Sequence, residues 1–436
     1  MFASVVNIGC RLNQSEGDSL RQHLANQGYE LVSGPLIPDP RNFELRTSNF
    51  ERPPTPDLVI INTCCVTREA ERSSLNRIRR AAALVPKPRV VVTGCLAELA
   101  PERLRRITGV NEVLGIAEKE RMIAGLPGIP DRSRAFLKVQ DGCPNHCAFC
   151  VVSTLRTIPY SKPPDQVRTE VLDLLTRGFC EIVLVGLNLG TYGRDVGTSL
   201  ARLLNELSDI PGRYRLRLSS LEPDTLSEDL VNTIARLGQA GILCPHLHLP
   251  LQSGADHLLC AMNRHYTAGY FRDLVERVVR CIPDINLGTD VIAGFPGEDE
   301  TSLAATRDLL ETLPLGYLHV FSYSPRPGTA AAGLKETIGR EVRKKEVARL
   351  RALGAAKSLA YRMRFASTVR TAVPIPRPTA SSLRSVAVMT DNYISVRVPA
   401  PRPLTPDLDP RPLPALVNVR IDRVSEAETC GTLVGP

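Results

Sequence analysis

Residues 141–150 read Asp141-Gly142-Cys143-Pro144-Asn145-His146-Cys147-Ala148-Phe149-Cys150, directly after the apolar run Ala135-Phe136-Leu137-Lys138-Val139-Gln140. The cysteines form a C-x3-C-x2-C array, and three thiolates in one short loop can hold three corners of an iron–sulfur cube. With no fourth cysteine in the loop, one iron stays open to a non-protein ligand. Zinc fits less well, since a structural zinc site takes four closed ligands and His146 lies inside the loop. A disulfide leaves one cysteine over. The array therefore predicts a cluster with one open iron.

Composition bounds the class of protein. The chain has 436 residues, 43% of them hydrophobic and 23% charged, which is ordinary for two or three folded domains. Its net charge of +8 makes a polyanionic partner plausible without establishing one. The twelve cysteines are not spaced as in a small secreted framework, and no signal peptide or membrane-length apolar run is expected. A reducing cytoplasm with metal-bound cysteines fits best.

Residues 1–127 predict a parallel α/β domain, because short apolar strands alternate with helices. Strands are expected at Ser4–Ile8, Leu58–Ile61 and Arg89–Val92, and helices at Ser19–Gln27, Arg68–Ala83 and Glu98–Ile107. The strands run into Cys10, Cys64 and Cys95. Since the carboxyl ends of parallel strands face one crevice, these thiols predict a second three-cysteine site. The alternative is buried cysteine acting as a small hydrophobe, and Cys65 is expected to point elsewhere. Pro35–Pro56 is expected to be an exposed loop.

Residues 132–365 predict a partial TIM barrel of six β/α units, with the cysteine loop after its first strand. The expected strands are Phe136–Gln140, Glu181–Gly186, Tyr214–Leu218, His246–Leu251, Asn286–Ile292 and Tyr317–Tyr323. The helices between them are expected at Val167–Thr176, Ser199–Leu207, Ser227–Leu237, Tyr270–Arg280 and Thr301–Thr312. In β/α barrels the loops that follow the strands form the active face, so the cysteine loop is placed where a cofactor is needed.

The remaining residues, 366–436, predict a small basic β-barrel. Strands are expected at Thr368–Val373, Ser385–Met389, Tyr393–Val398 and Leu416–Ile421, with a proline-rich loop at Pro399–Pro414. Arginines recur through this part, at Arg370, Arg384, Arg397, Arg420 and Arg423. Barrels of this size often bind RNA, although basic β-modules also serve as plain interaction domains. The helix expected before it, Arg340–Arg364, is better explained as a solvated helix of mixed charge than as a nucleic-acid contact.

The sequence resembles the radical S-adenosylmethionine methylthiotransferases along nearly its whole length. The resemblance rests on the loop 141–150 and on five further motifs: Asn7-Ile8-Gly9-Cys10-Arg11-Leu12-Asn13-Gln14, Ile61-Asn62-Thr63-Cys64, Val92-Thr93-Gly94-Cys95, Leu249-Pro250-Leu251-Gln252-Ser253-Gly254 and Gly294-Phe295-Pro296-Gly297-Glu298. The C-terminal part is similar to a TRAM domain, an RNA-binding barrel. Two features depart from the family pattern: a long Pro35–Pro56 loop, and a run after Cys150 that keeps Arg156 but lacks the usual glycine and other arginines.

The family branch that the sequence resembles most acts on N6-threonylcarbamoyladenosine at tRNA position 37, beside the anticodon. This similarity lies in Asn62-Thr63-Cys64-Cys65-Val66-Thr67 and His319-Val320-Phe321-Ser322-Tyr323-Ser324-Pro325-Arg326-Pro327-Gly328-Thr329. The isopentenyladenosine branch and the branch that modifies a ribosomal-protein aspartate are the alternatives. A tRNA-binding protein without catalysis, and a radical enzyme that transfers no sulfur, are rivals of another kind.

The resemblance implies two 4Fe-4S clusters and S-adenosylmethionine. The cluster on Cys143, Cys147 and Cys150 would bind and cleave S-adenosylmethionine, and the resulting radical would take hydrogen from C2 of the adenine. The auxiliary cluster would provide the methylated sulfur, with Cys10, Cys64 and Cys95 as its ligands. Such difficult chemistry belongs to the cofactor, and the protein positions the reactants and excludes water.

Contacts to S-adenosylmethionine are expected from the strand-end loops, at Asn188, Ser220, Glu222 and Gln252. Each of these can equally be a turn or capping residue, and Asp290 is expected to be a buried structural carboxylate. The partners that the resemblance implies are the tRNA anticodon stem-loop, an electron donor such as flavodoxin or ferredoxin, and a sulfur donor.

Overall fold

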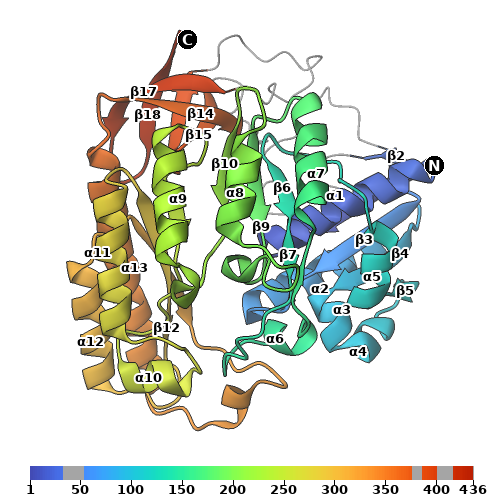
Figure 1. The fold of residues 1–436 in the computed structure, drawn as a ribbon. Helices are drawn as coiled ribbons and strands as arrows, with labels where there is room; N and C mark the ends of the chain where they lie inside the picture. Colours follow the sequence, from blue (N-terminus) through green and yellow to red (C-terminus); the bar gives the residue numbers. More distant parts are fainter. Residues whose placement is uncertain (33–53, 376–384, 400–415, 436) are drawn as a thin grey trace. The chain divides into compact units, whose positions relative to one another are not determined.

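The computed structural model describes residues 1–32, 54–375, 385–399 and 416–435. It divides into two compact units, one of Met1–Asp131 with Phe136–Lys138 and one of Arg132–Ala135 with Val139–Pro436. Both units combine helices and strands, which confirms the predicted α/β class (Figure 1). The predicted loops lie largely (35–56) or almost wholly (399–414) outside the described residues. The central and C-terminal segments fall in one unit, and the division into three domains stays a prediction.

The first unit is built on a five-stranded parallel sheet in the order β2-β1-β3-β4-β5. The three predicted strands are β1 (Phe2–Asn7), β3 (Leu58–Thr63) and β4 (Arg89–Gly94). Two-residue strands that the sequence analysis missed, β2 (Glu30–Leu31) and β5 (Glu112–Val113), add an edge on each side. Strands β3 and β4 are almost entirely buried, so the continuous apolar runs are those of a sheet covered on both faces.

Two helices of this unit differ from their predicted extent. Helix α1 (Arg11–Asn26) begins directly after Cys10, eight residues earlier than expected, because the polar residues Asn13 and Glu16 are fully buried in it. The predicted helix 98–107 is broken into α3 (Cys95–Leu99) and α4 (Pro101–Arg105). Pro101 lacks a backbone N–H and disfavours helical geometry in the residue before it, so Ala100 adopts φ −143°. Helices α2 (Arg68–Ala82) and α5 (Ile116–Ile123) complete the unit.

All six predicted barrel strands are present; five lie in the second unit, and β6 lies at the division, with Phe136–Lys138 counted in the first. Strands β6 (Ala135–Lys138), β9 (Glu181–Val185) and β10 (Arg215–Leu218) form one sheet, and β11 (His246–His248), β12 (Asn286–Ala293) and β13 (Tyr317–Ser322) form the other. A parallel bridge between Leu216 and Leu243 joins the two sheets. The resulting arc of parallel strands, with helices on its outer side in Figure 1, is the predicted partial barrel.

Short polar side chains set the starts of the barrel helices. Ser199, Ser227, Thr267 and Asp299 accept a backbone N–H in the first turn of α8 (Leu200–Ser208), α9 (Glu228–Gln239), α11 (Ala268–Cys281) and α12 (Glu300–Thr312), respectively. Such N-caps satisfy donors that the helix cannot, each contributing about 1 kcal/mol. Helix α7 (Pro164–Thr176) instead begins on a proline, which loses nothing at a first helical position.

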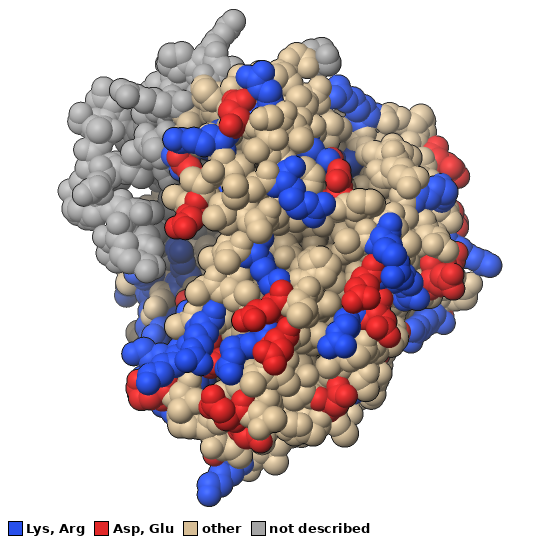
Figure 2. All heavy atoms as spheres, turned by 90° about the vertical axis from the view of Figure 1, so that its left-hand side faces the viewer, with Lys and Arg blue, Asp and Glu red and all other residues tan. Residues whose placement is uncertain are grey.

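Helix α13 (Arg340–Met363) follows the barrel and packs against β13, where Gly354 lies close to Leu318. Two of its charges are paired with neighbours outside the helix: Arg343 with Glu336 at 3.0 Å, and Glu346 with Arg307 at 2.8 Å. Figure 2, which presents the left-hand side of Figure 1, shows basic and acidic side chains interspersed over this face. The arrangement agrees with a solvated helix of mixed charge.

The C-terminal segment forms a closed barrel in the order β14-β15-β16-β18-β17, as expected for a TRAM-like module. Its strands are β14 (Val369–Ile375), β15 (Ser385–Thr390), β16 (Ser395–Pro399), β17 (Val417–Val424) and β18 (Thr429–Val434). The sequence analysis missed β18 and started β16 at Tyr393, which instead lies in the preceding turn with φ +65°. Residues Ala372, Val388, Val396 and Ile421 fill the barrel core.

Two arginines of the central barrel join it to the C-terminal one. Arg215 donates to the backbone oxygens of Thr371 and Met389, and Arg217 to those of Thr390 and Asp391, at 2.9–3.0 Å. Both also pair with Glu181, at 2.6 and 2.8 Å. Although burial acts to raise it, these two cations hold the pKa of Glu181 well below its usual range. The two barrels are therefore fastened by a buried ionic network. In the described residues, no helix is long and apolar enough to cross a membrane.

Candidate active site and cluster ligands

The loop 141–150 is held in shape by hydrogen bonds at both ends. Gly142 has φ +74°, and a Cβ there would lie 2.1 Å from the Ile158 carbonyl oxygen. The Cys143 amide donates to the Arg156 carbonyl at 3.1 Å, and the Asn263 side chain donates to the Asn145 and His146 carbonyls at 2.8 and 3.1 Å. Position 142 therefore requires glycine, both for its positive φ and for the close approach of the Ile158 carbonyl. Arg156 pairs with Asp141 at 2.5 Å, so this residue of the unusual run braces the loop.

The three thiols of this loop are partly exposed, and they lie close enough to influence one another's pKa. Burial raises the pKa of all three, that of Cys147 to about 12, and the Cys150 sulfur acts on both Cys143 and Cys147. Two donors oppose the effect of burial: Arg264 Nη1 lies 3.2 Å from Cys147 Sγ, and Asn188 Nδ2 lies 3.8 Å from Cys143 Sγ. Thiolates in such a place need positive charge, which iron supplies, so the donor set fits a cluster.

Arg264 links this loop to a buried carboxylate. Its guanidinium pairs with Glu222 and lies 2.8 Å from the Tyr266 hydroxyl. Burial raises the pKa of Glu222, and Arg264 offsets part of the rise. The sequence analysis missed Arg264 because it lies in a connection between helices, away from any strand end, where a single arginine carries no signal.

The four predicted cofactor contacts differ in their surroundings. Asn188 and Glu222 lie beside the cysteine loop, one at Cys143 and the other, through Arg264, at Cys147. The Oδ1 atom of Asn188 is buried and has no hydrogen-bond partner among the described residues, so it can accept from a bound molecule. Gln252 is buried with φ +74°, and its backbone N–H donates to the backbone carbonyl of Asp290. Ser220 is exposed. Their contact with S-adenosylmethionine stays a prediction.

The second group of cysteines comes together through the sheet of the first unit. Cys10, Cys64 and Cys95 each follow a central strand, and the register Asn7↔Asn62 and Asn62↔Thr93 brings the strand ends level. Surrounding protein atoms, with smaller contributions from the Cys64 and Cys95 thiols, raise the pKa of Cys10 to about 12, although the residue keeps an exposed surface. Cys10 and Cys95 also stand at helix starts, where the helix dipole favours a thiolate. The three thiols form one donor set that fits a cluster. Cys65 is fully buried.

Two glycines allow this convergence. Gly9 has φ +95°, and a Cβ on it would lie 2.5 Å from Cys64 Sγ. Gly94 has φ +93°, and a Cβ on it would lie 2.5 Å from the Thr63 carbonyl oxygen. The Asn13 side chain completes the arrangement, since its amide donates to the carbonyls of Ile8 and Thr63 at 2.9 and 2.8 Å. Asn13 is a structural residue of the site that the sequence analysis did not identify, because its role depends on two distant strand ends.

Comparisons with known proteins agree with this geometry. Residues 137–310 match the radical SAM superfamily, and residues 44–115 match a family described as the uncharacterized protein family UPF0004. The chain is 32% identical to the threonylcarbamoyladenosine tRNA methylthiotransferase MtaB of Thermotoga maritima, with 83% of each chain covered. The MtaB protein of Bacillus subtilis is 31% identical over 89% of this chain and 88% of its own.

The chain belongs to the radical S-adenosylmethionine methylthiotransferase family. It is an enzyme of that type, and its cofactors are S-adenosylmethionine and two 4Fe-4S clusters. Another relative, the tRNA-2-methylthio-N(6)-dimethylallyladenosine synthase of Jannaschia sp., is 34% identical over 75% of this chain and 73% of its own. Among solved structures, the radical S-adenosylmethionine methyltransferase TsrM of Kitasatospora setae has the same fold with a TM-score of 0.53, at 18% identity over 76% of this chain and 75% of its own.

Proposed function

We propose that this methylthiotransferase acts on tRNA and adds a methylthio group to C2 of N6-threonylcarbamoyladenosine at position 37. The observation that carries the proposal is the convergence of two separate cysteine triads in a chain similar to MtaB over most of its length. A radical enzyme that transfers no sulfur needs only the loop triad, and a tRNA-binding protein without catalysis needs neither. Both triads are present with donor or glycine residues placed around their sulfurs.

The residues are assigned the following roles. Cys143, Cys147 and Cys150 hold one cluster, Cys10, Cys64 and Cys95 hold the other, and Asn188 and Glu222 contact S-adenosylmethionine. When bound, these cofactors supply the radical that activates the unreactive C2–H bond and the sulfur that replaces the hydrogen. Arg264 positions Glu222 and offers an N–H to the Cys147 sulfur. The Oδ1 of Asn188 accepts from the bound molecule while its Nδ2 faces the Cys143 sulfur.

The C-terminal barrel is assigned to RNA binding, and the arginines of its described strands are already paired. Arg370 pairs with Asp284 and Asp391, Arg397 with Glu428, and Arg420 with Asp422, while Arg384 lies outside the described residues. Phosphates therefore compete with neighbouring carboxylates for these arginines. Each phosphate contact also releases counterions, so RNA binding should weaken steeply with salt. The anticodon stem-loop, an electron donor such as flavodoxin or ferredoxin, a sulfur donor and a cytoplasmic location belong to the same proposal.

The test is mass spectrometry of tRNA nucleosides from a deletion strain, repeated after complementation. The expected result is loss of 2-methylthio-N6-threonylcarbamoyladenosine, accumulation of its precursor, and recovery with the intact gene. Loss of the methylthio-dimethylallyl nucleoside instead would assign the protein to the other substrate. An unchanged nucleoside profile, together with one cluster or none in reconstituted protein, would overturn the enzyme assignment.

A further inference from the structure

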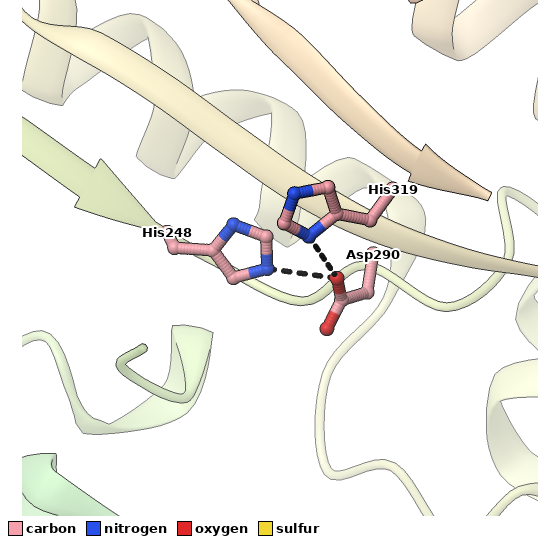
Figure 3. A group of neighbouring side chains, drawn as sticks. All are labelled: His248, Asp290 and His319. Atoms are coloured by element: carbon pink, nitrogen blue, oxygen red, sulfur yellow. Dashed lines mark hydrogen bonds and ion pairs between the residues drawn. The ribbon is translucent and has the colours of Figure 1, made fainter. Parts of the chain in front are cut away.

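A polar cluster crosses three adjacent strands of the central barrel and has no part in the roles assigned above. It consists of His248 at the end of β11, Asp290 in β12 and His319 in β13 (Figure 3). His248 Nε2 lies 2.9 Å from Asp290 Oδ1, and His319 Nδ1 lies 3.3 Å from the same oxygen. Asp290 had been expected to be a buried structural carboxylate, but its side chain is 24% exposed and is shared by two imidazoles.

The cluster is built so that one nitrogen faces outward. An ionised carboxylate only accepts hydrogen bonds, so both imidazoles carry a hydrogen on the nitrogen that faces Asp290. Burial opposes ionisation of Asp290, but the hydrogen bonds from His248 and His319 hold its pKa well below the usual range. His248 is 7% exposed and its Nδ1 lies 3.1 Å from the Tyr317 hydroxyl, whereas His319 is 55% exposed. Within the described residues, Nε2 of His319 has no hydrogen-bond partner, so it is the cluster's open end.

The polar cluster of His248, Asp290 and His319 lies on the same face of the barrel strands as the polar partners of the cysteine loop. Gly288 has no side chain, which lets the Tyr317 ring lie over β12 and reach both His246 and His248. Asp290 is close enough to Glu222 to raise the pKa of that carboxyl, and Glu222 pairs with Arg264 at Cys147. Phe321, two residues beyond His319 and 39% exposed, extends the same side of β13. His319 is therefore linked, through Asp290, to the polar group that surrounds the cysteine loop.

We propose that His319, held by Asp290, binds the carboxylate of the N6 substituent of the substrate adenosine. This inference rests on the proposed function and concerns the choice between the two substrates of the relatives. A threonylcarbamoyl group carries a carboxylate, and an imidazole that takes up a second proton on Nε2, with its Nδ1–H held by Asp290, can donate to that carboxylate. A dimethylallyl group is a hydrocarbon, and packing it here would leave the polar cluster dehydrated without a partner. Overall identity of 31–34% to both kinds of relative does not distinguish the two substrates, whereas the charge of the N6 substituent that this cluster binds would.

A divalent cation is the other ligand that two imidazoles and a carboxylate can hold. It is the weaker interpretation, because Asp290 Oδ1 already receives both ring N–H groups. A metal would need those two nitrogens without hydrogens and would displace both bonds.

The experiment compares reconstituted wild type, His319→Gln and Asp290→Asn on anticodon stem-loop RNAs. The RNAs carry threonylcarbamoyladenosine, the methyl ester of the same nucleoside, or dimethylallyladenosine. For wild type, kcat/KM should be about 10- to 100-fold higher for the acid than for the ester, the range of one charge-assisted hydrogen bond. In both variants this ratio should fall toward one through loss on the acid alone. Cleavage of S-adenosylmethionine without RNA should be unchanged, and replacement of His23, a half-buried histidine of the first unit, by Gln is the matched control.

The outcomes separate the inference from the function on which it rests. If wild type modifies the acid and the ester equally, or if His319→Gln keeps the wild-type ratio, the role of His319 is wrong while the proposed function stands. If wild type modifies only the dimethylallyl RNA, the proposed function and the inference both fail. The last measurement, metal analysis of the folded protein, tests the alternative of a bound cation. One additional divalent ion per chain that His319→Gln loses, with an unchanged acid-to-ester ratio, would overturn carboxylate binding in favour of a metal site.

Discussion

The two cysteine sites of this protein use the same ligand type and are built in opposite ways. In the barrel unit, the three thiols lie within eight residues of one loop, and its shape is fixed by hydrogen bonds from Cys143 to the Arg156 carbonyl and from Asn263 to the loop. In the first unit, the thiols are spread from residue 10 to residue 95 and meet only because three strands end level. The ligands of the loop site are therefore adjacent in sequence and receive support from the distant Asn263, whereas those of the strand-end site are brought together by sheet register. Damage to the sheet should affect only the second.

The largest effect is expected from Cys143→Ala, which removes a ligand of the loop site. S-adenosylmethionine cleavage and methylthiolation should both fall below detection, and about half of the iron should be lost, because a cluster with two remaining thiolates is not held. Production of 5′-deoxyadenosine and iron content are the measurements. Cys260→Ala, an exposed cysteine in the same unit, should behave as wild type. Normal cleavage by Cys143→Ala would contradict the assignment of this loop.

Cys64→Ala should separate the two sites. Methylthiolation is expected to disappear while S-adenosylmethionine cleavage continues, since the loop site does not depend on this residue. The adjacent Cys65→Ala provides the control, because Cys65 is equally buried but is not assigned as a ligand. Product analysis by mass spectrometry and the rate of 5′-deoxyadenosine formation decide it. Surviving methylthiolation would remove the strand-end triad from sulfur transfer.

Arg264→Gln tests whether the loop site is as local as its ligands suggest. Leaving Glu222 buried without its cation should cost about 3–5 kcal/mol, and S-adenosylmethionine cleavage should fall with it. Arg264→Lys should recover part of both. Arg177→Gln breaks a solvent-accessible pair with Asp173 and a contact with the Phe179 ring, and should cost below about 1 kcal/mol. Equal effects of the two Gln variants on thermal unfolding and on cleavage would show that the loop needs no distant support.

Gly94→Ala should distort the strand-end site by straining the backbone next to Cys95. A non-glycine residue at φ +93° costs about 1–2 kcal/mol, and the contact with the Thr63 carbonyl adds to it. We expect a lower Tm, loss of auxiliary-cluster iron and reduced methylthiolation with intact cleavage. Gly28→Ala is the matched variant, because Gly28 has φ +83° but open space around it. A similar loss of iron in both would mean that close approach at Gly94 is unimportant.

The smallest effect concerns a strand-end loop of the barrel that carries no cysteine. Burial raises the pKa of Glu298 to about 7 from 4.5, so the unfolded chain releases this proton at lower pH than the folded one. The carboxyl therefore destabilises the fold progressively between pH 4.5 and 7, and by a constant amount above that. Glu298→Gln should match wild type in free energy of unfolding near pH 4.5 and exceed it at pH 8 by about 1–3 kcal/mol, which is seen as a higher Tm. Iron content should not change. A pH-independent difference in Tm would contradict the raised pKa.

The sequence by itself determined whatever depends on neighbouring residues. The loop triad, the strand–helix alternation and the strand ends that carry Cys10, Cys64 and Cys95 were all readable, because hydrophobic periodicity and cysteine spacing are local signals. The early start of α1 was not, because Asn13 and Glu16 look like surface residues until distant strands supply their partners. The break at Pro101 was a local signal that the sequence analysis did not use.

Only the tertiary structure decided which charged residues meet. Arg264 reaches Cys147 and Glu222, and Arg215 and Arg217 pair with the buried Glu181. The sequence predicted Asp290 to be a structural carboxylate, whereas in the structure it is the centre of an accessible cluster. Its partners His248 and His319 come from two other strands. Buried charges are stabilised only by partners at a few ångströms, and residues far apart in sequence reach that distance only once the chain has folded.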